Sequence, residues 1–311
     1  MKKIILILSV LFSFSILLSA CSNAKEQGPN KKNQLTIYTT VFPLQYFTEQ
    51  IGGKYVAVKT IYPPGADEHT FEPSQKDMMH LADSDLFFYI GLGLEGFVEK
   101  AKGTLKNQNV TMVATADKLQ LPKDGHSDEV ADGHQHGDVN PHVWLDPIYS
   151  RDMAAVIRDA LVKKMPQNKK VFDQNYQKLA KELEQLNAKY EGTISKAAHK
   201  KIIVTHAAFG YWEKRYGIEQ ISISGLSTTN EPTQKELEKI ISLAENEGIH
   251  YILFEQNVKS QLGNIVQKEI GAKALPIHNL AVLTEKNIND KETYFSLMNK
   301  NLDSVETALT K

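Results

Sequence analysis

Apolar residues recur with two different periods along most of the chain. Short apolar runs rich in β-branched and aromatic residues alternate with longer segments in which apolar residues follow helical spacing. Strands are expected at 35–42, 56–62, 86–91, 110–113, 201–205, 219–224, 251–255 and 272–277. Because helical segments separate nearly all of these runs, the pattern predicts α/β architecture with parallel sheets covered by helices.

Helix-start and helix-stop residues support this alternation. Pro43 begins and Gly52 ends the first helical segment, and Ser74 can cap the second. Helices are expected at 43–53, 74–84, 95–105, 148–165, 207–217, 231–248, 259–271 and 291–309.

One amphipathic segment, 166–198, is too long for this pattern. Its apolar positions are Val171, Tyr176, Leu179, Leu183, Leu186 and Tyr190. At ~1.5 Å per residue such a helix spans roughly 45 Å, more than a compact α/β layer needs, and it holds too few heptads to favour a coiled coil. The pattern therefore predicts two α/β lobes, 35–165 and 199–311, joined by one long helix across a cleft that suits a small ligand.

The first residues predict export rather than folding. Two lysines precede an apolar run over 4–18, as in a secretory signal peptide, which we expect to occupy 1–20. A permanent membrane anchor is the alternative, but the run is short for a membrane span. Cys21 is the only cysteine, so no intramolecular disulfide can form. Residues 21–34 are polar and aperiodic, which is typical of a flexible tether.

Composition and charge give no support to partners that bind through strong electrostatic attraction. Of the 311 residues, 41% are hydrophobic and 23% are charged, and the formal net charge is −1. These are the values of an ordinary globular protein. They give no electrostatic reason to expect nucleic acid or a polybasic membrane contact.

Side chains that can bind metal follow several predicted strands. In parallel α/β sheets, ligands bind beyond the carboxyl ends of the strands. The residues there are Glu68 and His69 after 56–62, His206 after 201–205, Glu255 ending 251–255, His278 after 272–277, and His142 before the helix at 148–165. A single histidine at a strand end is usually a hydrogen-bonding residue, but four at one cleft indicate a metal site. His80, His199 and His250 lie on predicted helices or just before strands, and we expect them to be incidental.

The stretch 125–138 contains three more histidines and almost no apolar residues. They are His126, His134 and His136. The stretch predicts a mobile, solvated loop whose imidazoles bind zinc weakly near the cleft, with a merely solubilising loop as the alternative. His142 differs, because Pro141 restricts the backbone before it and Trp144 can pack and fix its direction, so we assign it to the tight site.

Four motifs lie along the chain in the order "PPGADEHTFEPS", "NPHVWLDP", "VTHAAFGYW" and "FEQNV". They resemble those of the metal-binding receptor lipoproteins of bacterial ABC importers for zinc and manganese. The resemblance covers the chain after Cys21, and "LSAC" resembles the lipobox in which that cysteine carries lipid. It implies a lipid-anchored protein on the extracytoplasmic face of the cell membrane, with an ABC permease and its ATPase as partners.

The resemblance also implies metal ligands. The family histidines of the first two motifs correspond to His69 and His142. The third motif carries histidine in zinc-type members and commonly glutamate in manganese-type members, and here it carries His206. The fourth position, often aspartate in the family, falls at or next to His278. Because this sequence departs from the family there, His278, Glu255, Glu68 or a water molecule are all alternatives for the fourth ligand.

The ligand type predicts the metal and the function. Imidazoles suit Zn²⁺ in a tetrahedral site, whereas manganese favours oxygen ligands at higher coordination, and copper and nickel also bind imidazole. We therefore expect a monomeric, non-enzymatic, high-affinity receptor that binds Zn²⁺ outside the cytoplasm and delivers it to the permease. The alternatives are a membrane-anchored zinc-dependent hydrolase with Glu68 or Glu255 as general base, and a manganese-type receptor or adhesin. No HExxH, GxSxG or glycine-rich phosphate loop favours the hydrolase.

Overall fold

The computed structural model describes residues 34–122, 139–256 and 260–310. The expected signal peptide, the tether up to residue 33 with Cys21, and the three histidines of the 125–138 stretch lie outside the described residues. No helix in the described ranges is long and apolar enough to cross a membrane.

The first sheet has four parallel strands in the order β2-β1-β3-β4. They are β1 (Leu35–Thr39), β2 (Val56–Thr60), β3 (Leu86–Tyr89) and β4 (Thr111–Ala114). The associated helices are α2 (Phe42–Gly52), α3 (Gln75–Ala82) and α4 (Val98–Leu105), with a 3-10 turn at Gly53–Tyr55. Ser74 caps α3 by accepting a hydrogen bond from the Asp77 amide, as its sequence position predicts. The first strand ends earlier than expected, because Pro43 already lies in the first turn of α2.

The second sheet repeats this topology in the order β6-β5-β7-β8, again with all strands parallel. Its strands are β5 (Lys201–His206), β6 (Glu219–Ser224), β7 (Tyr251–Glu255) and β8 (Lys273–Ile277). Its helices are α7 (Gly210–Tyr216), α8 (Gln234–Asn246), α9 (Gln261–Glu269), α10 (Glu285–Asn289) and α11 (Tyr294–Thr310), with a 3-10 turn at Ala207–Phe209. The two parallel-sheet lobes confirm the fold class that the alternating pattern predicts.

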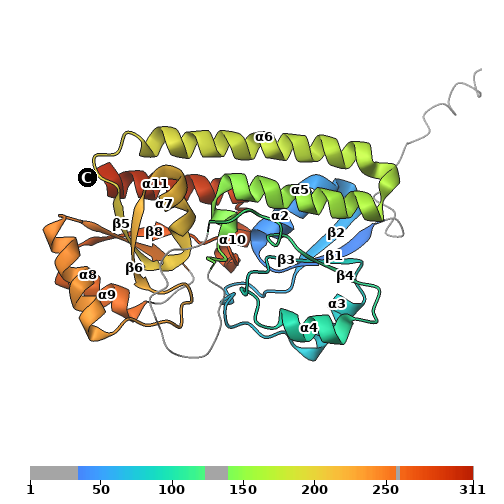
Figure 1. The fold of residues 1–311 in the computed structure, drawn as a ribbon, viewed down its shortest axis with the longest axis horizontal. Coiled ribbons are helices and arrows are strands. Elements are labelled where there is room, and N and C mark those ends of the chain that lie inside the picture. The colour runs from blue at the N-terminus through green and yellow to red at the C-terminus, as the bar shows by residue number, and fades with distance from the viewer. Residues whose placement is uncertain (1–33, 123–138, 257–259, 311) are drawn as a thin grey trace, which may run out of the picture. The chain divides into compact units, whose positions relative to one another are not determined.

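A long helix, α6 (Lys169–Ile194), joins the lobes and runs above both of them in Figure 1. It follows α5 (Pro147–Lys164) and a 3-10 turn at Pro166–Asn168, so it is somewhat shorter than the expected 166–198. Its inward face holds Phe172, Leu183 and Tyr190, which are completely buried, whereas Val171 is exposed. The helix packs against α5 and α2 of the first lobe and against α11 of the second, so it contacts helices that belong to both lobes.

A second segment, 278–283, also connects the lobes. It leaves β8 and reaches the first lobe, where the Phe42 amide donates to Ala281 O at 2.8 Å and the Gly65 amide donates to Leu283 O at 3.0 Å. The Trp144 indole N–H donates to Asn279 O at 2.6 Å. The main apolar core is continuous through both lobes, so they are packed against each other and not merely tethered by α6.

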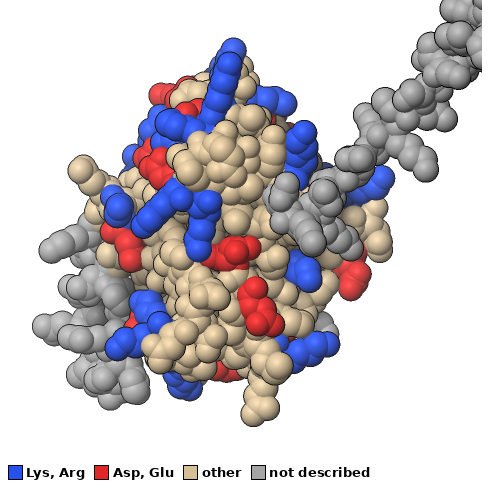
Figure 2. Space-filling model, turned by 90° about the vertical axis from the view of Figure 1, so that its right-hand side faces the viewer, with Lys and Arg blue, Asp and Glu red and all other residues tan. Residues whose placement is uncertain are grey.

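Surface charge is mixed on the face that Figure 2 shows. Lysine and arginine side chains are interspersed with aspartate and glutamate side chains there, with uncharged surface between them. This distribution matches the net charge of −1 and offers no large patch of one sign on that face.

Candidate metal centre

Three histidines from separate parts of the chain converge between the two sheets. His69 lies in the loop after β2, His142 lies just before the 3-10 turn at Val143–Leu145, and His206 is the last residue of β5. Each offers one ring nitrogen, and these atoms all lie within 4.8 Å of one another. His142 and His206 are completely buried, and the His69 side chain is 9% exposed.

Local structure fixes where each histidine points. Asp67 Oδ1 accepts the His69 backbone N–H at 2.9 Å, which closes a tight turn before that residue. Asn140 Oδ1 accepts the backbone N–H of His142 at 2.9 Å in the same way. His206 needs no such turn, because its backbone is part of the sheet and pairs with Ser224 of β6.

The spacing of two imidazoles matches a tetrahedral zinc site. The Nε2 atoms of His69 and His142 lie 3.3 Å apart. Two nitrogens bound to tetrahedral Zn²⁺ at ~2.0–2.1 Å are separated by about 3.3 Å, so the separation of these two atoms suits one ion bound to both. The rings also meet at steep angles, 61° for His69 with His142 and 77° for His142 with His206.

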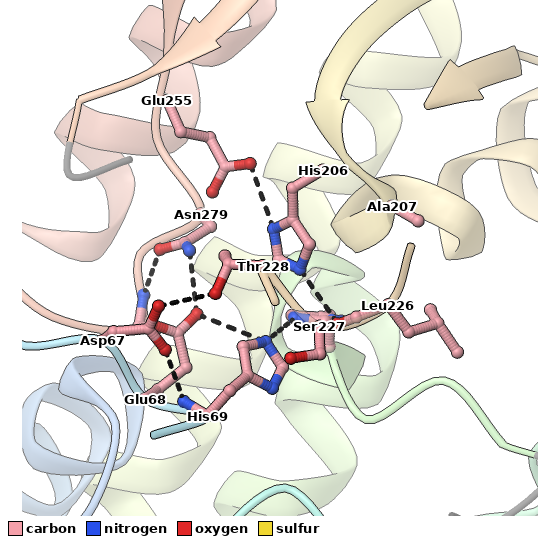
Figure 3. Close-up of polar contacts among 12 residues, drawn as sticks. Asp67, Glu68, His69, His206, Ala207, Leu226, Ser227, Thr228, Glu255 and Asn279 are labelled. Atoms are coloured by element: carbon pink, nitrogen blue, oxygen red, sulfur yellow. Dashed lines mark hydrogen bonds and ion pairs between the residues drawn. The ribbon is translucent and has the colours of Figure 1, made fainter. Parts of the chain in front are cut away.

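His206 is paired with a buried carboxylate. The register of β5 and β7 aligns Val204 with Leu253 and so brings the two strand ends, His206 and Glu255, side by side. His206 Nδ1 lies 3.1 Å from Glu255 Oε1, and Nε2 lies 3.0 Å from Leu226 O (Figure 3). A carboxylate and a carbonyl only accept hydrogen bonds, so both ring nitrogens carry protons. Burial alone would lower the pKa of His206, but the charge and hydrogen bond of Glu255 raise that pKa to about 9.

The other two histidines are neutral. Burial, together with the positive charge of His206, lowers the pKa of His69 to about 4. Burial and the same charge hold the pKa of His142 well below its usual range. The triad therefore offers two neutral imidazoles and one imidazolium whose Nε2 proton must leave before that nitrogen can bind a metal.

Two acidic residues of the first lobe lie next to the triad. Glu68 Oε1 is 4.0 Å from His69 Nε2 and accepts a 2.9 Å hydrogen bond from the Asn279 side-chain amide. Burial raises the pKa of Glu68 to about 7, and the Glu255 and Asp67 carboxylates act in the same direction. Asp67 Oδ2 accepts a 2.6 Å hydrogen bond from the Thr228 hydroxyl, which ties the loop after β6 to the loop after β2 (Figure 3).

The structure does not bring His278 into this group. Its Nδ1 accepts a 2.8 Å hydrogen bond from the Leu280 amide, and its Nε2 lies 3.2 Å from Asn287 Oδ1. Both ring nitrogens are thus engaged in the turn that follows β8, where Leu280 has a φ of 61°. No ring nitrogen of His278 belongs to the group of ligand atoms that lie within 4.8 Å of one another, so the structure gives no support to His278 as the fourth ligand. Glu255 is also turned toward another partner, since its Oε1 contacts His206, while its Oε2 is buried with no hydrogen-bond partner among the described residues.

Comparison with known proteins agrees with this geometry. The profile of the family described as "Zinc-uptake complex component A periplasmic" matches residues 37–308. The chain belongs to this zinc-uptake family. The match includes both lobes, α6 and all three histidines.

Relatives in the zinc-uptake family are similar over nearly the whole chain. The zinc-binding lipoprotein AdcA of Streptococcus pneumoniae is 35% identical over 98% of this chain, which spans 61% of the AdcA length. The high-affinity zinc uptake system protein ZnuA of Bacillus subtilis is 30% identical, with 97% of each chain covered. The crystal structure of the Zn(II)-bound ZnuA-like domain of Streptococcus pneumoniae AdcA superposes with a TM-score of 0.76 at 31% identity, covering 89% of this chain and 100% of that one.

Two asparagines of this zinc-uptake family member contact site residues without being part of the predicted site. The side-chain amide of Asn279 donates a hydrogen bond to Glu68, and the side-chain oxygen of Asn140 forms a hydrogen bond with the His142 ring. The contact of Asn140 could have been predicted from the sequence, because Asn140 stands two residues before His142, with Pro141 between them. Asn279 had no such signal, since it is far from Glu68 in the chain and meets it only through the 278–283 segment.

Proposed function

We propose that this protein is an extracytoplasmic receptor that binds Zn²⁺ through His69, His142 and His206 and delivers it to an ABC permease. The observation that carries the proposal is the convergence of three imidazoles from both lobes, two of them already at the separation that tetrahedral Zn²⁺ requires. The ion is cargo in this proposal, because a receptor must release it as well as bind it.

The donor set favours zinc over manganese. All three grouped ligands are nitrogen, and manganese prefers oxygen ligands in larger number. The relatives AdcA and ZnuA are named for zinc, which supports the same choice.

Glu68 is the group that we propose as the fourth ligand. Its Oε1 already lies 4.0 Å from His69 Nε2, and it is nearly fully buried, so a short movement would bring a carboxylate oxygen to the ion. Burial raises the pKa of Glu68 despite the positive charge of nearby His206, so the carboxylate would be stabilised by a stronger cationic partner. A divalent ion would supply that partner.

Delivery and location are supported by the family and by the first residues of the chain. The family is described as a component of a zinc-uptake complex, and AdcA is named a lipoprotein. We propose that 1–20 is a signal peptide, that Cys21 carries lipid, and that 21–34 is a tether holding the lobes near the permease and its ATPase.

A competition titration tests metal binding. Purified protein, stripped of metal, is titrated with zinc against a chelator of known affinity, and separately with manganese. We expect one tight zinc site, much weaker manganese binding, and loss of the tight site in His142→Ala and His206→Ala. His80→Ala is the matched control, because His80 is exposed on α3 and should leave binding unchanged. Manganese binding tighter than zinc binding, or tight zinc binding that survives both substitutions, would overturn the proposal.

Delivery is tested in cells. A strain lacking the gene is complemented with wild type, His206→Ala or Cys21→Ala, and uptake of radioactive zinc is measured under zinc limitation. We expect uptake only from the wild type and, at a reduced rate, from Cys21→Ala released from the membrane. Full uptake with His206→Ala would show that zinc transport does not depend on this metal site.

A further inference from the structure

Asn140 contacts both lobes at the metal centre. It lies in the first lobe just before His142, is only 4% exposed, and meets the segment that begins α7 in the second lobe. Its side-chain oxygen faces His142, its side-chain nitrogen faces Ala207 O at 3.3 Å, and its main-chain oxygen accepts the Tyr211 hydroxyl at 2.5 Å.

The hydrogen bonds of Asn140 determine which nitrogen of His142 carries the proton. A backbone N–H can only donate, so the atom that receives the His142 amide at 2.9 Å must be the oxygen Oδ1. The same oxygen lies 2.8 Å from His142 Nδ1. It can only accept there as well, so Nδ1 carries the proton of this neutral imidazole. The lone pair is then on Nε2, the atom that faces His69 at 3.3 Å.

The other end of the amide is held against the residue after His206. Asn140 Nδ2 donates to the carbonyl of Ala207, and Gly210 leaves the space for this approach. A Cβ at Gly210 would lie 3.0 Å from Asn140 Nδ2 and 3.1 Å from Gln220 Nε2, closer than most real Cβ contacts. The amide therefore spans from the ring of His142 to the chain that carries His206.

We propose that Asn140 is a positioning residue that presents Nε2 of His142 to the ion and fixes the spacing between His142 and His206. This inference rests on the proposed zinc site. A side chain already held in its binding direction loses less entropy on coordination. Hydrogen-bond partners behind metal-bound imidazoles typically contribute about 10- to 100-fold in metal affinity. Asn140 differs from Glu255, the partner of His206, in being neutral, so it sets the tautomer of His142 without adding charge.

The first test reads the tautomer in metal-free protein and does not depend on zinc. Long-range proton–nitrogen correlation spectra of protein with ¹⁵N-labelled histidine distinguish Nδ1–H from Nε2–H, and His142→Gln identifies the signal. We expect Nδ1–H in the wild type, retention of Nδ1–H in Asn140→Asp, which keeps an acceptor, and a shift toward Nε2–H in Asn140→Ala. An Nε2–H signal in the wild type, or an unchanged tautomer in Asn140→Ala, would overturn the proposal.

The second test measures zinc affinity by chelator competition. We expect Asn140→Ala to weaken binding about 10- to 100-fold. Gly210→Ala should weaken binding less and leave the tautomer unchanged, because it displaces Nδ2 without removing any group of the site. Asn175→Ala is the matched control, since this asparagine donates to Ile51 O at 2.9 Å away from the histidines, and it should not change affinity.

The two tests distinguish a failure of the proposed zinc-binding function from a failure of the proposed role of Asn140. If the wild type fails to bind zinc tightly, the proposed function fails, and the tautomer spectra still decide the role of Asn140. If the wild type binds tightly and Asn140→Ala and Gly210→Ala bind as tightly as the control, Asn140 is only structural. Gly210→Ala keeps the test decisive should Asn140→Ala fail to fold.

Discussion

Glu255 Oε1 lies 3.1 Å from Nδ1 of His206, and neither side chain is more than 1% exposed. This pair makes His206 the one member of the triad that is charged near neutral pH, because its pKa is raised to about 9. Zinc must therefore displace a proton at this residue, and the same pair that holds the ring in place makes binding depend on pH.

Zinc affinity should fall as pH decreases in two stages. Between about pH 9 and pH 7 one proton, on His206, competes with zinc, so affinity should fall by up to about tenfold per pH unit. Below about pH 7 Glu68 also takes up a proton, and the slope should steepen if Glu68 is a ligand. His69, with its pKa at about 4, should add nothing above pH 5. Competition titrations across this range measure the slope, and Glu68→Gln should remove only the second stage. A fall confined to the free-imidazole range near pH ~6.5 would contradict this assignment.

Glu255→Gln should weaken zinc binding most at high pH. The variant keeps a hydrogen-bond acceptor but loses the charge that makes His206 basic, so affinity should drop about 10- to 100-fold at pH 9.5. At lower pH the loss should shrink, because the proton that competes with zinc is also held less strongly. Calorimetry in buffers of different ionisation enthalpy should show fewer protons released per zinc than in wild type. An equal loss of affinity at every pH would mean that Glu255 acts by packing alone.

His278→Ala should affect folding rather than zinc. Its ring makes hydrogen bonds with the Leu280 amide and with Asn287 in a buried turn, so the free energy of unfolding should decrease by about 1–3 kcal/mol. Zinc affinity, measured below the unfolding transition, should match wild type, whereas His206→Ala in the same assay should lose the tight site. A loss of zinc affinity comparable to that of His206→Ala would instead indicate that His278 is a ligand.

Deleting residues 125–138 should leave one tight zinc site. The three grouped histidines lie outside the deleted stretch, so their geometry does not depend on His126, His134 or His136. Calorimetric titration should show that only weaker, additional zinc binding is lost. Loss of the tight site would contradict this prediction and would indicate that one of these three histidines is a ligand of that site.

The lobes should move little when zinc binds. The long helix α6 packs against helices of both lobes, the 278–283 segment is hydrogen bonded to the first lobe, and the main core is continuous. A wide opening would break this core and the hydrogen bond between Thr228 and Asp67. Small-angle scattering with and without zinc should therefore give nearly equal radii of gyration. A clear decrease in the radius of gyration on zinc binding would contradict this prediction, because it would require a hinge between the lobes.

The sequence by itself determined the architecture, because the signals that specify it are local. The period of the apolar residues distinguishes strands from helices within a few residues, and Leu183 and Tyr190 recur at the spacing that places them on the buried face of α6. The approach of His69 and His206 was also predictable, since ligands in parallel sheets bind where strands end. His142 follows no strand and was expected from its motif, and the expected fourth member, His278, is not in the group.

Only the tertiary structure decided what each side chain at those strand ends does. His278 and His206 occupy equivalent places after apolar strands, yet the ring of His278 is engaged by its own turn and Asn287, whereas His206 faces the other histidines. The protonation of the triad likewise depends on Glu255, which meets His206 only because β5 and β7 are neighbours in the sheet. Periodicity reports which face of an element is buried, but side-chain direction and pKa depend on burial and on charges brought together from distant parts of the chain.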